Sequence, residues 1–181
     1  MKPIDPGPDR LPPIAPAQWT VAQREVAQAM IAGPRGAVLA PFVPLLRSPE
    51  LADHVQRLGE HLRYRCAIGV RLTELAILLT AAEWQQAVEW AIHVPIAERE
   101  GIASETIAAI ARHERPAGLA DDEAAVYDVC IELHRQRCVS DAAWSRAMAL
   151  FGEQGVVDLI GINGYYAMLA MVMNAARTPA P

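Results

Sequence analysis

Two acidic residues and one histidine between positions 74 and 93 have the types and spacing that could do chemistry. Glu89 and His93 are four residues apart, so they project from one face of a helix. Glu74 lies on an earlier leucine-rich stretch, where an unpaired carboxylate would be costly, and Arg71, three residues before it, is one available partner. If the two stretches fold back as a helical hairpin, Glu74 reaches the face that carries Glu89 and His93. Two carboxylates around an imidazole can hold it near a neutral pKa as a proton shuttle. The alternative is a Glu–His pair on a solvated helix face.

Other kinds of site are excluded by spacing. His54 and His61 lie seven residues apart on one predicted helix, about 10 Å along its axis, which is too far for both to bind one metal ion. The sequence has no HExxH motif, no paired CxxC motifs and no acidic calcium loop. It also lacks the GxSxG motif of serine hydrolases. We therefore predict no metal site.

The elements that must position these residues all show helical periodicity. Serines or aspartates precede several of them as N-cap candidates, namely Ser48, Ser104, Asp121 or Asp122, and Ser140. The helix over residues 71–82 is apolar around most of its circumference, so it should be a central helix. Pro95 should kink the helix that contains Glu89 and His93. The predicted helices cover about residues 19–32, 49–62, 71–82, 84–100, 105–113, 122–137, 141–151 and 154–176. No run of alternating residues suggests a strand, so the predicted fold class is all-α.

The length of 181 residues suits a single domain. We expect a proline-rich N-terminal arm over residues 1–18, one helical domain over 19–176 and a short tail over 177–181. The last apolar stretch, Val156 to Ala176, contains Asp158 and is better explained as a helix buried in an oligomer than as a membrane span.

Composition limits the partners and the compartment. The net charge of −5 and the lack of a Lys/Arg cluster argue against nucleic acid and anionic membranes as partners. The three cysteines, Cys66, Cys130 and Cys138, are odd in number and form no CxxC pair. With no apolar signal-peptide segment in the first residues, this pattern indicates a reducing, cytoplasmic location.

The central stretch RLTELAILLTAAEWQQAVEWAIHVPIAEREGI resembles the carboxymuconolactone decarboxylase family, which shares its fold with the alkylhydroperoxidase (AhpD-like) proteins. The family pattern is R-x-x-E, then E-W-x-x-H-x-x-x-A, then a glycine. It is matched by Arg71, Glu74, Glu89, Trp90, His93, Ala97 and Gly101. The likeness extends on both sides over most of the chain. It implies a single AhpD-like helical domain that assembles as a homo-oligomer, a trimer or a hexamer.

The peroxidase branch of that family carries C-x-x-C-x-x-x-H on the same helix. Here His93 matches its histidine, but Gln86 and Glu89 occupy the two cysteine positions. A hydroperoxide is attacked by a thiolate, and a second thiol must then close a disulfide, which Gln and Glu cannot do. The resemblance therefore favours the branch that lacks the CxxC motif.

The decarboxylase branch acts without a cofactor on a small carboxylated, lactone-like substrate. The resemblance implies His93 as proton donor, Glu74 as its orienting partner, and Glu89 as a second proton carrier or as the group that fixes the imidazole tautomer. The predicted substrate-binding residues are Arg71, Trp90 and Tyr165, with packing as the alternative role of Trp90 and interhelical hydrogen bonding as that of Tyr165.

Val88 stands where that branch has a tyrosine. A related isomerase or hydrolase acting on a small carbonyl compound fits the same residues. Two further alternatives remain, a peroxidase that uses a thiol outside a CxxC motif and a non-catalytic oligomeric binding protein.

Overall fold

The structure is a computed structural model that describes residues 7–180, and within that range it contains helices and connecting segments but no strand. The all-α prediction is therefore confirmed for the described residues. Residues 1–6 of the predicted arm and residue 181 of the predicted tail lie outside them. The elements are η1 (Pro16–Gln18), α1 (Val21–Ala32), α2 (Phe42–Leu45), α3 (Pro49–Tyr64), α4 (Val70–Glu83), α5 (Ala87–Arg99), α6 (Ser104–Ala111), α7 (Asp121–Gln136) and α8 (Asp141–Ala176).

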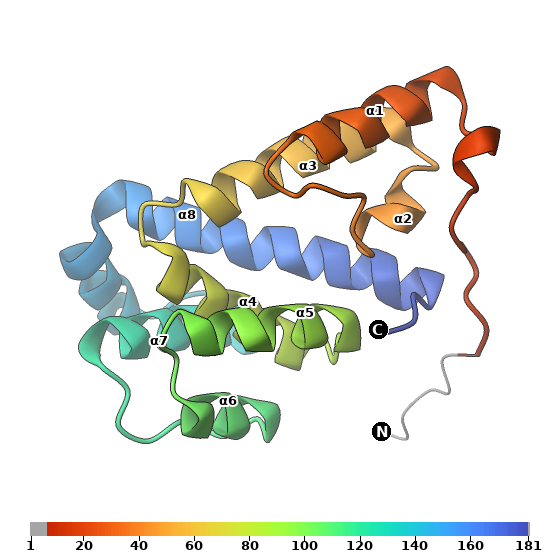
Figure 1. Cartoon of the computed structure of the whole chain (residues 1–181). Coiled ribbons are helices and arrows are strands. Elements are labelled where there is room, and N and C mark those ends of the chain that lie inside the picture. The colour runs from red at the N-terminus through yellow and green to blue at the C-terminus, as the bar shows by residue number, and fades with distance from the viewer. Residues whose placement is uncertain (1–6, 181) are drawn as a thin grey trace.

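Helix α8 runs between two groups of helices (Figure 1). It contacts α2 and α3 on one side and α4 and α7 on the other. Helix α4 packs against α5, α7 and α8, and every residue from Leu72 to Ala81 is buried. This confirms the prediction of a central helix, which followed from apolar residues around most of its circumference.

Helix α8 bends sharply at Gly152, where φ is 65° and ψ is −178°. A side chain at this position would be strained, because L-residues rarely adopt such a backbone conformation. The sequence predicted two helices, 141–151 and 154–176, and the break at Gly152 divides α8 into these two parts.

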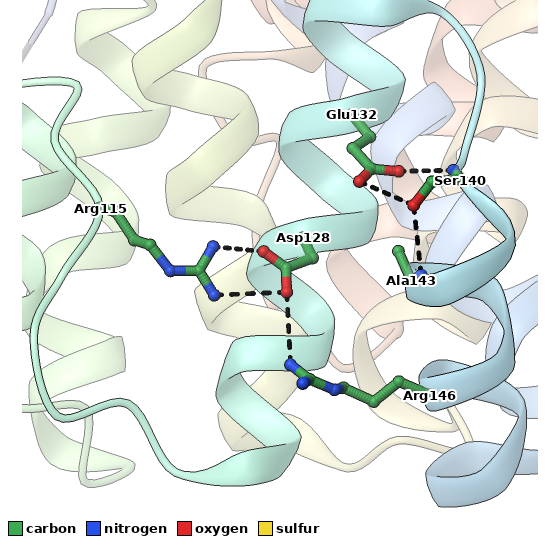
Figure 2. Close-up of polar contacts among 6 residues, drawn as sticks. All are labelled: Arg115, Asp128, Glu132, Ser140, Ala143 and Arg146. Carbon is green, nitrogen blue, oxygen red and sulfur yellow. Dashed lines mark hydrogen bonds and ion pairs between the residues drawn. The ribbon is translucent and has the colours of Figure 1, made fainter.

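The start of α8 is tied to α7 by polar contacts (Figure 2). The Oγ of Ser140 accepts a hydrogen bond from the Ala143 amide at 3.3 Å, which confirms the predicted N-cap. The Glu132 carboxylate accepts from the Ser140 amide at 2.6 Å and from its hydroxyl at 3.0 Å. In the same region Asp128 of α7 pairs with Arg115 and with Arg146 of α8. These contacts connect the first turns of α8 to α7.

Of the three other predicted N-caps, Ser48 has the predicted position but makes no capping hydrogen bond, and the other two were wrong. Ser48 occupies the N-cap of α3, but its ψ of 79° is far from the extended value of a capping residue, and its side chain accepts no cap hydrogen bond. Helices α6 and α7 begin at Ser104 and Asp121 themselves, so neither residue is the cap. At α7 the capping contact comes from inside the helix, because the Glu123 carboxylate accepts the Ala120 amide hydrogen at 3.1 Å.

The connection between α4 and α5 is longer than the sequence indicated. A helix was predicted from residue 84, but Trp84 ends α4, Gln85 takes a left-handed conformation with φ of 49°, and α5 begins at Ala87. Gln86 caps α5 by accepting the Val88 amide hydrogen at 2.7 Å. The turn therefore uses three residues that the periodicity had assigned to the helix. Helix α5 then continues through Pro95.

The described part of the N-terminal arm lies against the end of α8. The Arg10 amide donates to the Ala176 carbonyl at 2.8 Å, and the Arg47 guanidinium donates to the Pro12 carbonyl at 2.6 Å. The arm is thus attached to the domain through backbone carbonyls at both of these points.

Among the described residues, one helix has the length and composition that could cross a membrane, namely α8 with a mean hydropathy of 1.6. Of its most apolar window, 56% is buried inside the protein. A core helix passes the same test, so this observation is weak support for a span.

Candidate functional site

The hairpin of α4 and α5 brings Glu74, Glu89 and His93 together. Nδ1 of His93 lies 2.6 Å from Oε2 of Glu74, and its Nε2 lies 3.2 Å from Oε2 of Glu89. The predicted approach of Glu74 to the Glu89/His93 face is therefore confirmed. Both imidazole nitrogens face a carboxylate, so a protonated His93 donates one N–H to each.

These three side chains are almost completely removed from solvent, with exposed fractions of 3%, 1% and 2% for His93, Glu74 and Glu89. The solvated-face alternative is thus wrong. Burial lowers the pKa of His93, but the hydrogen bonds to Glu74 and Glu89 outweigh it, and the net effect raises the pKa above 6.5. The imidazole is therefore held toward its cationic form.

An arginine outside the hairpin completes the charge balance. Nε of Arg63, on α3, lies 3.9 Å from Oε1 of Glu74. With His93 protonated, the four groups carry two positive and two negative charges. A buried cluster of this kind is tolerated because no charge is left uncompensated.

One oxygen of this cluster has no partner. Oε1 of Glu89 is buried and makes no hydrogen bond to any described residue. Glu89 and His93 line a cavity of about 20 Å³, which has room for about one water molecule. An unpaired carboxylate oxygen beside a cavity is a group that can exchange a proton with a molecule bound there.

Two arginines and two tyrosines also line the cavity. Arg63 comes from α3, Arg35 from the segment between α1 and α2, and Tyr165 and Tyr166 from α8. The Tyr166 ring meets the imidazole of His93 edge-to-face at 5.3 Å and the Tyr165 ring at 5.2 Å. Burial raises the pKa of Tyr165 to about 12 and that of Tyr166 well above its ordinary value. Both remain neutral phenols that can donate a hydrogen bond.

A glycine on α3 makes room for the tyrosine hydroxyl. A Cβ added to Gly59 would lie 2.0 Å from Oη of Tyr165 and 2.8 Å from a guanidinium nitrogen of Arg35. Only a residue without a side chain allows this approach. Gly59 therefore determines where two polar groups of the cavity lie.

Of the three predicted substrate-binding residues, one lines the cavity and two do not. Tyr165 lines the cavity. Trp90 is half-buried and packs against the hydrophobic core, and it is not among the residues that line the cavity. Arg71 pairs with Asp122 and Glu123 of α7, so it is neither the partner of Glu74 nor part of the cavity.

The sequence did not point to Arg35, Arg63 or Gly59. Arg63 lies 30 residues and Arg35 58 residues before His93, both on other elements, and no spacing rule connects them with His93. Gly59 did carry a signal, because a glycine inside a helical pattern with no capping role indicates a close approach.

None of the three cysteines is among the residues that line this cavity. Burial raises the pKa of Cys66, and it raises that of the fully buried Cys130 to about 12, so both are held as thiols. Cys138 is exposed. Among the described residues, no group of three His, Cys, Asp or Glu side chains is arranged to hold a metal ion.

Comparison with known proteins does not extend these findings. No protein-family model matches the sequence, and no curated protein matches it significantly.

Proposed function

We propose that the protein is a member of the carboxymuconolactone decarboxylase family that acts without a cofactor as a lyase, or as a related proton-transfer enzyme, on a small carboxylated or lactone-like substrate. The observation that carries this proposal is the unpartnered Oε1 of Glu89, next to a cavity and within a buried Glu74–His93–Glu89 group. A buried proton carrier with one free oxygen supports proton transfer to a bound substrate.

The contacts of His93 suggest a division of roles. Glu74 holds the Nδ1–H and fixes the ring, while the Nε2–H faces Glu89. Since neither ring nitrogen is free, Glu89 is the group we expect to exchange the proton with the substrate. His93 then supplies the proton to Glu89 and is recharged from solvent after each cycle.

In the decarboxylation the substrate C–C bond to the carboxylate breaks and CO₂ leaves. The electron pair passes into an enolate-like system, which Arg63, Arg35 and the Tyr165 hydroxyl can stabilise by charge and hydrogen bonding. A proton from the His93–Glu89 pair then forms the new C–H bond. The sum is loss of CO₂ and gain of one proton, with no redox step.

The thiol alternative lacks comparable support, because Cys66 and Cys130 have raised pKa values and neither lines the cavity.

For assembly, we propose a homo-oligomer, a trimer or a hexamer, formed through the face of α8 on which Val157 is 63% and Met171 50% exposed. We propose a cytoplasmic location, with no nucleic-acid or membrane partner, from the charge and the cysteine pattern given above.

The test is CO₂ release from carboxymuconolactone by the full-length protein. We expect wild-type protein to release CO₂ and His93→Gln to be at least about 100-fold slower, the usual size of a lost general acid. His54→Gln is the matched control, because His54 is exposed on α3 and does not line the cavity. Circular dichroism of each variant establishes that it is folded.

No CO₂ release by folded wild-type protein would refute the lyase assignment. Equal rates for His93→Gln and wild-type protein would remove His93 from the mechanism.

A further inference from the structure

The candidate cavity is closed to any molecule of the size of the proposed substrate. Its volume of about 20 Å³ has room for about one water molecule. The side chains of Glu89 and His93, which line it, are only 2% and 3% exposed. A small carboxylated lactone is much larger than a water molecule. Part of the wall must therefore move before such a compound can reach the unpartnered oxygen of Glu89.

Three sides of the cavity are formed by helices of the packed core. Arg63 comes from α3, Glu89 and His93 from α5, and Tyr165 and Tyr166 from α8. Each of these three helices packs against the central helix α4. Because protein interiors are close-packed, displacing any of them would disrupt contacts of the core.

The fourth side is the non-helical segment 33–41 between α1 and α2, which contributes Arg35, Leu39 and Pro41 to the wall. Its backbone hydrogen bonds are local. The Gly36 amide donates to the carbonyl three residues before it at 3.2 Å, and the Leu39 carbonyl accepts from the first amide of α2 at 2.9 Å. Within residues 7–180, no hydrogen bond joins the backbone of this segment to α3, α5 or α8. It can therefore move without breaking a helix, as segments of low local stability do.

The side chain of Arg35 holds this segment in place, together with the apolar contacts of residues 38–40 with the core. Its guanidinium donates to the amide oxygen of Gln56 on α3 at 3.4 Å and lies 4.9 Å from the centre of the Phe42 ring on α2. Phe42 is buried, and α2 packs against α3 and α8, so both contacts are to the packed part of the domain. Arg35 itself is half-buried, which places it at the rim of the cavity.

We propose that segment 33–41 is a lid over the candidate site and that the Arg35 side chain is the latch that keeps it closed. Opening moves Arg35 and Leu39 away from Arg63 and Ile92, the half-buried lining residues of α3 and α5. The open lid admits a substrate to Glu89, and the closed lid excludes water during proton transfer. The role in substrate entry rests on the proposed function, whereas the opening itself does not.

The test measures how fast a thiol behind the lid is labelled. Leu169 lines the cavity and is 2% exposed, so Leu169→Cys places a thiol there. Cys66 and Cys138 are replaced by serine, which leaves the fully buried Cys130 of α7 as a reference outside the cavity. The probe is methyl methanethiosulfonate, from which a thiolate displaces methanesulfinate to form a methyl disulfide. Peptide mass spectrometry of the full-length protein resolves the two positions.

At neutral pH without denaturant, the thiol introduced by Leu169→Cys should be labelled at least about tenfold faster than Cys130. The reason is that opening the lid requires less free energy than unfolding the core. Adding Arg35→Ala should accelerate labelling behind the lid by about a further tenfold, because the variant removes one hydrogen bond from a charged group and one cation–π contact.

Arg115→Ala is the matched control. The Arg115 guanidinium also lies over an aromatic ring, that of Tyr127 at 4.8 Å, and also has a polar partner, Asp128, but it does not line the cavity. These contacts persist when the lid opens, so labelling behind the lid should stay within about twofold of the rate without this substitution.

Equal labelling of the two thiols, no acceleration by Arg35→Ala, or the same acceleration by Arg115→Ala would each overturn the lid. Circular dichroism establishes folding. If Leu169→Cys does not fold, His93 of the protein without that substitution is the reporter. Its carbethoxylation by diethyl pyrocarbonate should be about tenfold faster in Arg35→Ala than in Arg115→Ala, and equal rates would overturn the proposal.

The fate of the lid is separate from that of the proposed function. Lid opening in a protein that releases no CO₂ from carboxymuconolactone would overturn the proposed function and leave the lid standing. CO₂ release by a protein in which both thiols are labelled at the same rate would do the reverse.

Discussion

Replacing Gly59 by alanine perturbs the candidate site without replacing any of its titratable side chains. In a helix interior, alanine is normally more stable than glycine by about 1 kcal/mol. At this position the new methyl group would lie 2.0 Å from Oη and 2.4 Å from Cζ of Tyr165. Real Cβ atoms do not come so close to other atoms, so the tyrosine ring must move.

The size of the effect follows from what holds that ring. Tyr165 is 4% exposed and packs edge-to-face on Tyr166, which in turn packs on His93. A ring held in this way has little room to yield, and overpacking a core costs about 1–3 kcal/mol. Taking the upper end and subtracting the gain of about 1 kcal/mol in helix propensity leaves a destabilisation of about 2 kcal/mol. In a protein of this size the melting temperature should fall by about 4–8 °C.

Gly164→Ala provides the matched control. Gly164 is also within a helix, and a Cβ added there meets no atom of the same chain within 4 Å. It lies on the α8 face proposed for assembly, so the gain of about 1 kcal/mol over wild-type protein is expected where the oligomeric state is unchanged. Urea unfolding followed by circular dichroism measures both variants, and sedimentation establishes that their oligomeric state is unchanged. A Gly59→Ala protein as stable as Gly164→Ala would refute the packing described around Tyr165.

Three further predictions concern protonation, thiols and the hairpin turn. The pKa of the His93 imidazole, followed by NMR, should lie above 6.5. The contribution of its carboxylate contacts to the free energy of unfolding should be complete below about pH 6.5 and be lost as the pH rises through the pKa of the folded protein. A pKa below about 6 would contradict this. Replacing Cys66, Cys130 and Cys138 together by serine should leave CO₂ release by the folded protein within about twofold of wild type, since no step uses sulfur; loss of activity would favour the thiol alternative. Gln86→Ala should lower the free energy of unfolding by about 1 kcal/mol, because α5 loses its cap, and no change in urea unfolding would refute that role.

Much of the helical architecture was predictable because its signals are local. The period of the apolar residues located α4 as the central helix, and Ser140 located the start of α8. The spacing of Glu89 and His93 placed both on one helix face, and the hairpin hypothesis brought Glu74 to them. Each of these inferences concerns residues on one helix or on two consecutive helices.

What the sequence could not indicate depends on contacts between distant segments. Arg71 had two possible roles near Glu74, and the chain instead pairs it with Asp122 on α7, a helix whose position relative to α4 has no local signal. Arg63 reaches the cavity because α3 packs against α4 and α8, and Arg35 reaches it because the segment before α2 lines the same cavity as α5 and α8. The start of α7 differs for a local reason: Glu123 caps the helix from within by accepting the Ala120 amide hydrogen, so neither aspartate is the cap.

The most direct test of the proton-transfer site is deuterium incorporation into α-angelica lactone in D₂O, followed by NMR, with wild-type protein, Glu89→Gln and Glu98→Gln. This unsaturated lactone has an acidic C–H next to its carbonyl group, so exchange reports proton transfer alone, without decarboxylation. Glu98 lies on the same helix as Glu89 but is exposed, and it serves as the control. We expect wild-type protein and Glu98→Gln to catalyse exchange at similar rates and Glu89→Gln to be at least about 100-fold slower. Equal exchange by folded Glu89→Gln, or none by wild-type protein, would contradict the assignment of Glu89 as the proton carrier.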